Sequence, residues 1–88
     1  MASFMQEHPD SKSGLRSWAQ TIESNGFRHF VELKKTFGSA DHVKPHTVFN
    51  ISGNKYRIIA LVHYQLQSVA VEEILTHKDY DRGKWRKS

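Results

Sequence analysis

The sequence of 88 residues has no cysteine, only two prolines and no apolar run near the ~18–20 residues that a membrane span needs. The missing cysteines exclude disulfide scaffolds, thiol nucleophiles and zinc sites built on thiolates. The first ten residues also lack the basic start and apolar stretch of a signal peptide. Hydrophobic residues make up 38% and charged residues 25%. The length and composition therefore predict one small soluble domain.

Positive charge is concentrated toward the C-terminus. Residues 1–43 carry five basic and five acidic side chains, whereas residues 44–88 carry eight basic and four acidic ones. Four of those basic residues fall in the last seven positions, where no acidic residue occurs. Such a segment attracts polyanions through counterion release, but a solvated terminus that binds nothing explains it equally well. We therefore divide the chain into a single domain, 1–81, and a basic C-terminal tail, 82–88.

Two helices are predicted in the first half of the chain. The first runs from Asp10 or Ser11, either of which can cap it, to about residue 24, and Asn25-Gly26 ends it. The second runs from about residue 29 to 37. Each helix has one apolar stripe, which we expect to face the core. The stripes consist of Leu15, Trp18, Ala19 and Ile22 in the first helix and Phe30, Leu33 and Phe37 in the second.

After residue 46 the residue pattern changes from that of helices to that of β-strands. Strands are predicted over 47–51, 56–64 and 69–76, and Gly53 and Asn54 supply positive φ in the tight turn between the first two. The middle strand is apolar on both faces, so we place it centrally in a sheet that is covered on both sides. The fold class is α+β, with two N-terminal helices packed on one face of a small antiparallel sheet.

This topology gathers polar residues at one end of the sheet. In an antiparallel meander the third strand ends near the start of the second, so His77 should lie beside Arg57. Lys55, Lys78 and Tyr80 fall at the same end. RNA cleavage needs a phosphate ligand and proton carriers, and Arg, His and Tyr can supply them without a metal. A structural alternative remains open, because Arg57 can simply pair with Glu73 or Asp79.

Two other features are predicted less sharply. His42 and His46 flank Lys44-Pro45 in an expected loop, where no helix presents them together, so no metal site is predicted. Trp85 lies among the basic residues of the tail. It can stack on a nucleic-acid base or serve as an anchor for a partner protein.

Two motifs in the second half resemble a known family. Residues 48–57 read VFNISGNKYR and residues 76–81 read THKDYD. Together, at this spacing, they resemble the signature of the HigB toxins, which belong to the RelE-like superfamily of bacterial toxin–antitoxin systems. The resemblance implies a cytoplasmic endoribonuclease, an mRNA interferase, that cuts mRNA on the ribosome without a metal or other cofactor and arrests translation. It also implies a helix-turn-helix antitoxin, HigA-like, through which the complex binds operator DNA.

The resemblance implies roles for individual residues. Arg57 would hold the scissile phosphate, while His77 and Tyr80 would be the proton-transfer or base-positioning pair. Asn50 and Asn54 would fix the strand and the turn. Further RNA contacts are expected from the basic residues Lys55, Lys78, Arg82 and Lys84.

The sequence departs from the family pattern in two ways. The N-terminal strand and part of the first helix of the family have no counterpart here, which predicts an unpaired sheet edge. Glu72 stands where a basic residue is expected, and it would weaken phosphate binding if it faced the RNA. The alternative function is therefore a catalytically weakened, non-enzymatic module of the same fold that binds RNA or the antitoxin.

Overall fold

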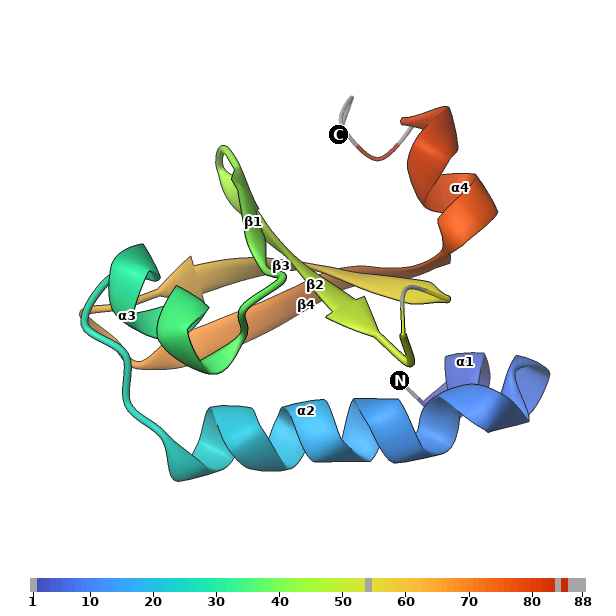
Figure 1. The fold of residues 1–88 in the computed structure, drawn as a ribbon, viewed down its shortest axis with the longest axis horizontal. Helices are drawn as coiled ribbons and strands as arrows, with labels where there is room; N and C mark the ends of the chain where they lie inside the picture. The colour runs from blue at the N-terminus through green and yellow to red at the C-terminus, as the bar shows by residue number, and fades with distance from the viewer. Residues whose placement is uncertain (1, 54, 84, 86–88) are drawn as a thin grey trace.

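The structure is a computed structural model that describes residues 2–53, 55–83 and 85. Its strands form one antiparallel sheet in the order β1-β2-β3-β4, with helices on it (Figure 1). This confirms the predicted α+β class. None of the described helices is long and apolar enough to cross a membrane. The elements are α1 (Ala2–Glu7), a 3-10 turn η1 (Pro9–Ser11), α2 (Lys12–Ser24), α3 (Phe30–Thr36), β1 (Asp41–Val43), β2 (His46–Ile51), β3 (Tyr56–His63), β4 (Ser68–Thr76) and α4 (His77–Arg82).

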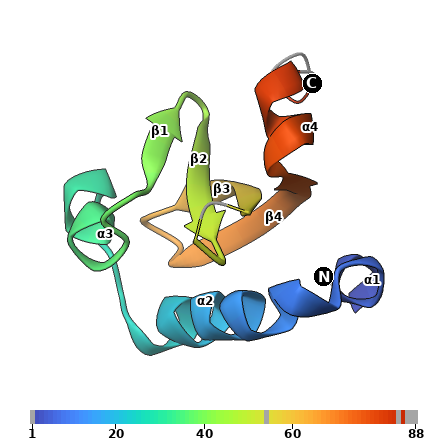
Figure 2. The same cartoon turned by 45° about the vertical axis from the view of Figure 1, so that its right-hand side comes forward.

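The longest helix, α2, lies along one face of the sheet (Figures 1 and 2). Its predicted stripe faces inward, and Leu15 and Trp18 are buried. The Trp18 ring meets Phe49 of β2 edge-on, with centroids 5.3 Å apart. Gly14 permits this close approach, because a Cβ there would lie 2.7 Å from the Cγ2 atom of Ile51. The apolar period of 3.6 residues therefore identified the buried face correctly.

The ends of α2 fall where expected but are made differently. Ser11 is the residue before the helix, yet its hydroxyl donates to the carbonyl oxygen of His8 at 2.7 Å and does not cap α2. At the other end Asn25 is extended and its side chain donates to the carbonyl oxygen of Thr21. No left-handed glycine is used there, because the chain leaves the helix in an extended conformation.

The three predicted strands form to within a residue of their expected bounds. In the turn between β2 and β3, positive φ occurs at Ser52 and Gly53, and Asn54 lies outside the described residues. The expected loop around Lys44-Pro45 is a two-residue turn that joins β1 and β2 in a hairpin, and it is shorter than predicted. His42 and His46 therefore lie in paired strands. A three-residue strand such as β1 has too few side chains to show a period.

The second face of the sheet is covered near one end. There Val48, Ile59 and Trp85 form a small buried cluster, with Tyr80 and Leu75 packed against it. Figure 2 shows α4 rising from the end of β4 on the opposite side of the sheet from α2. The central strand β3 is thus buried on both faces, as predicted, with Ile58 in the larger core and Ile59 in the smaller one.

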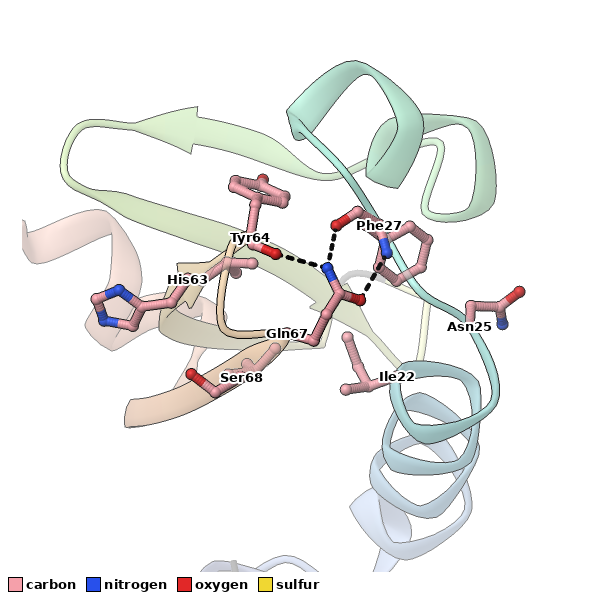
Figure 3. Close-up of a pocket in the computed structure, with 9 residues that line it drawn as sticks. Ile22, Asn25, Phe27, His63, Tyr64, Gln67 and Ser68 are labelled. Carbon is pink, nitrogen blue, oxygen red and sulfur yellow. Dashed lines mark hydrogen bonds between the residues drawn. The ribbon is translucent and has the colours of Figure 1, made fainter.

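The opposite end of the sheet is fastened by one glutamine in the turn between β3 and β4 (Figure 3). The Gln67 Nε2 atom donates to the carbonyl oxygens of Phe27 and Tyr64 at 2.7 and 2.6 Å. Its Oε1 atom accepts from the Phe27 amide at 3.2 Å. The segment between α2 and α3 is thereby fixed to the sheet, beside a hollow of only about 30 Å³.

Candidate active site

The site lies where the turn between β2 and β3 meets the start of α4. Thr76, the last residue of β4, caps α4 by accepting from the amide of Asp79 at 3.2 Å. The backbone amide of His77, the first residue of α4, donates to the carbonyl oxygen of Lys55 at 3.0 Å. These two bonds place the first turn of α4 beside the first residues of β3. The predicted meeting of Arg57 and His77 at one end of the sheet is therefore confirmed.

Arg57 is at the centre of the cluster. Its Nη2 atom lies 3.2 Å from Nδ1 of His77, and its Cζ atom lies 5.2 Å from the ring centroid of Tyr80. Its Nη1 atom donates to the carbonyl oxygen of Tyr56. Arg57 is 8% exposed, whereas His77 is an exposed residue at the protein surface. The guanidinium is thus held by aromatic and backbone groups at this end of the sheet, beside the exposed His77.

The second nitrogen of His77 also has a partner. Its Nε2 atom lies 3.2 Å from Oδ2 of Asp81, one helical turn further along α4. An arginine has only donors, so Nδ1 must accept from Arg57. In that arrangement Nε2 carries the proton and donates to the Asp81 carboxylate. The geometry therefore assigns both the tautomer and the orientation of this ring.

Asp81 was not predicted as a site residue. Its signal is the spacing i, i+4 from His77, which brings two side chains together only on a helix. No helix was predicted after residue 76. Thr76 followed by Asp79 is a recognisable helix start, and it would have revealed the pair.

Trp85 is part of the protein interior. Its ring stacks on Tyr80 with centroids 5.2 Å apart and an interplanar angle of 15°. Its Nε1 atom donates to the carbonyl oxygen of Tyr80 at 3.1 Å. Both roles predicted for Trp85 were wrong, because a side chain that is 4% exposed has little surface for a base or a partner. Trp85 instead supports Tyr80, which in turn lies under Arg57.

The predicted RNA contacts are placed in different ways. Lys78 is exposed in the first turn of α4. Arg82 closes the same helix, and its Nη1 atom lies 3.6 Å from Oδ1 of Asp79. Lys55 lies 3.6 Å from Asp10, on the side of the N-terminal helices. Lys84 lies outside the described residues.

The contact of Asp10 with the sheet perturbs two ionisations. The Tyr56 hydroxyl donates to Oδ1 of Asp10 at 2.5 Å. This hydrogen bond lowers the pKa of Asp10, and the charge of Lys55 lowers it further. The same bond raises the pKa of the Tyr56 hydroxyl. Because Tyr56 precedes Arg57, this contact ties the N-terminal segment to the strand that carries the site.

Within residues 2–53, 55–83 and 85, no three His, Asp or Glu side chains gather as ligands of one ion would.

Comparison with known proteins gives a consistent result. The family model of the HigB toxin, the RelE-like toxic component of a toxin–antitoxin system, matches residues 11–83. The mRNA interferase toxin HigB of Escherichia coli K12 is 35% identical over 79 residues, which are 86% of this chain and 76% of the relative. The mRNA interferase HigB of Shigella flexneri matches to the same extent. The mRNA interferase HigB of Escherichia coli O6:H1 is 25% identical over 80 residues, 88% of this chain and 78% of the relative.

Proposed function

Because the chain belongs to the HigB toxin family, the RelE-like toxic components of toxin–antitoxin systems, we propose that it is an endoribonuclease that cleaves mRNA and stops protein synthesis. The relatives named above are called mRNA interferases. The single observation that carries the proposal is the contact of the Arg57 guanidinium with both His77 and the ring of Tyr80. A phosphate ligand, a proton carrier and a phenol meet there, and His77 is exposed to solvent.

Cleavage of RNA by its own 2′-hydroxyl needs three contributions. The 2′-oxygen loses its proton as it attacks phosphorus, the phosphoryl oxygens gain negative charge, and the departing 5′-oxygen takes up a proton. Arg57 stabilises the charged oxygens through its fork of donors. The products are a 2′,3′-cyclic phosphate and a new 5′-hydroxyl end.

His77 accepts the proton of the 2′-hydroxyl. In the free protein its Nδ1 lone pair is occupied by Arg57. When a phosphate draws the guanidinium toward its oxygens, Nδ1 is released at the place where the substrate is bound. The Asp81 carboxylate, which accepts from Nε2, stabilises the imidazolium that forms. Substrate binding and activation of the base are then one event.

Tyr80 has two roles in this proposal. Its ring faces the Arg57 guanidinium, and such contacts are worth about 0.5–2 kcal/mol. Its hydroxyl is the proton donor for the departing 5′-oxygen. The stacked ring of Trp85 restricts Tyr80 to an orientation that serves both roles.

The remaining parts of the proposal concern partners. Lys78 and Arg82, on exposed positions of α4, contact neighbouring phosphates of the RNA. Lys55 and Lys84 are further RNA contacts in this proposal, and Lys84 lies outside the described residues. The reaction needs no metal and takes place on mRNA bound to the ribosome. A helix-turn-helix antitoxin neutralises the protein, and the complex binds operator DNA through that antitoxin.

The test is expression in bacteria together with cleavage of ribosome-bound mRNA by purified protein that has first been treated with EDTA and then freed of it, since the ribosome itself needs Mg²⁺. Wild type should arrest growth and cut mRNA, whereas His77→Gln and Arg57→Ala should do neither. Thermal unfolding of both variants shows whether they fold. If both fold and remain fully toxic, the assigned site is wrong. If wild type binds RNA in a salt-sensitive way but neither cuts it nor arrests growth, the chain is the non-enzymatic binding module.

A further inference from the structure

Asn50 lies directly across the sheet from Arg57. The two residues are partners in the antiparallel pairing of β2 and β3, and directly opposed residues have Cβ atoms about 4.5–5.5 Å apart on one face of a sheet. That face carries α4, because Val48, two residues before Asn50, belongs to the smaller buried cluster. Phe49 and Ile51 belong to the larger core on the opposite face. Asn50 therefore lies beside Arg57 on the face of the candidate site.

The Asn50 side chain takes no visible part in holding the strand together. It belongs to neither buried cluster, and within the described residues its amide makes no hydrogen bond. It is partly exposed, whereas the other residues from 47 to 51 are buried. Asparagine is also disfavoured in strands. A polar side chain with these properties, next to a candidate phosphate ligand, is available for contact with a substrate.

The two neighbours of Arg57 across the sheet differ in kind. On β4 the opposite residue is Leu75, which packs against the smaller buried cluster. On β2 the opposite residue is Asn50, which carries a hydrogen-bonding amide. Of these two neighbours, only Asn50 can add a hydrogen bond to a phosphate that contacts Arg57.

The chemistry of an amide limits what Asn50 can do. It does not titrate, so it serves as neither acid nor base, but its Nδ2 atom carries two donors. The non-bridging oxygens of the scissile phosphate gain negative charge in the reaction, and each can accept more than one hydrogen bond. An arginine fork across these oxygens therefore leaves room for a further donor. Asparagine side chains are among the donors that stabilise such developing charge.

We propose that Asn50 is a second ligand of the scissile phosphate, and that its Nδ2 atom donates to one of the two non-bridging oxygens beside Arg57. The proposal rests on the proposed function, because it needs the phosphate to be held at Arg57. A neutral donor suits this position. It stabilises the charged oxygen without placing a second positive charge directly opposite the Arg57 guanidinium.

The experiment replaces single oxygens of the substrate with sulfur, a poorer acceptor. Ribosome-bound synthetic mRNAs carry a phosphorothioate at the position that wild type cuts, as separate Rp and Sp forms. Asn50→Ala should cut the all-oxygen RNA on the order of 10²-fold more slowly than wild type does. For one of the two forms, the slowing caused by sulfur should be about ten-fold smaller in Asn50→Ala than in wild type. For the other form it should be unchanged.

Asparagine at the end of α2 provides the matched control. Asn25→Ala removes an exposed amide that bonds only to the Thr21 carbonyl oxygen, and it should cut every RNA as wild type does. Thermal unfolding shows whether each variant folds. Asn50→Val, which suits a strand better, takes the place of Asn50→Ala if the alanine variant unfolds, and the same losses are expected.

Binding of a 2′-O-methyl RNA, which cannot be cut, separates the two proposals. Asn50→Asp brings a negative charge to the phosphate and should weaken this binding more than Asn50→Ala does, whereas Asn25→Asp should bind like wild type. If folded Asn50→Ala cuts at the wild-type rate, or keeps both sulfur effects in full, the role of Asn50 is wrong and the nuclease stands. If wild type cuts nothing, the nuclease is wrong. The phosphate contact then stands if Asn50→Asp binds more weakly than Asn50→Ala, and is overturned if the two bind alike.

Discussion

The two ends of the sheet hold their polar side chains in opposite ways. At the end shown in Figure 3, Gln67 bonds only to backbone groups of Phe27 and Tyr64, and the hollow beside it is too small for a ligand. At the other end Arg57, His77 and Asp81 contact one another through side chains, and the His77 and Asp81 side chains are more than half exposed. Bonds to the backbone fasten the fold, whereas the contacts of the exposed His77 and Asp81 side chains can be exchanged for contacts with a ligand.

The largest effect on RNA cleavage is expected at the end of the sheet that carries Arg57. Arg57→Lys keeps the charge but loses the fork of donors that matches two phosphate oxygens. We expect cleavage to slow by about 10²–10³-fold, with a small change in the free energy of unfolding. Single-turnover cleavage and urea unfolding measure the two quantities. A variant that unfolds readily but cleaves normally would place Arg57 with the structural residues.

At the end of the sheet held by Gln67, a substitution should reduce stability and leave RNA cleavage unchanged. Gln67→Ala leaves the Phe27 amide and two carbonyl oxygens without their partner, which we expect to cost about 1–3 kcal/mol of stability. Cleavage per folded molecule should not change, because Gln67 is remote from the site. Gln65→Ala, at an exposed position of the same turn, is the control and should be neutral. If Gln67→Ala loses cleavage without losing stability, the purely structural role assigned to Gln67 is wrong.

A smaller effect is expected for the residue that acts through His77. Asp81→Asn keeps an acceptor for Nε2 but removes the negative charge that stabilises the imidazolium. We expect kcat to fall about ten-fold with KM nearly unchanged, since Asp81 does not touch the RNA. Asp79→Asn, which removes a charge facing Arg82 on the same helix, should leave kcat close to wild type. A rise in KM alone would mean that Asp81 affects RNA binding and not the proton.

The smallest effect is on stability and concerns Asp10, which joins the N-terminal segment to β3, the strand that carries Arg57. Its pKa is lowered in the folded protein, chiefly by the Tyr56 hydroxyl. Folding therefore gains stability from this carboxylate above its unfolded pKa, near 3.8, and loses that gain as the pH falls through the lower folded value. Asp10→Asn should be less stable than wild type at pH 7, and the gap should narrow by pH 3 in urea unfolding. Asp41→Asn, at an exposed position of β1, is the control for the loss of one carboxylate.

The sequence predicted the elements that are long enough to show a repeating apolar pattern, and the contacts that follow from the order of the strands. The helix α2 and strand β3 have enough residues for their apolar faces to be recognised. The meeting of Arg57 and His77 follows from hairpin geometry alone. The elements that were missed, α1, β1 and α4, have three to six residues each, and elements so short depend on tertiary packing for their stability.

The missed side-chain contacts have the same origin. Trp85 is buried only because the chain turns back after α4, where Gly83 has a φ of 72°. Nothing in the composition of the basic tail indicates that turn. Similarly, the register shift that leaves Glu72 without an opposite residue on β3 depends on how β3 and β4 pair.

The position of Trp85 has a practical consequence for spectroscopy. The chain has two tryptophans; Trp18 is enclosed by the main core and Trp85 lies against Tyr80. Replacing Trp18 with phenylalanine leaves a single tryptophan, one ring away from the Arg57 guanidinium, whose emission can be excited apart from that of the tyrosines. Its emission can then report occupancy of that site in real time, without a dye or a labelled oligonucleotide.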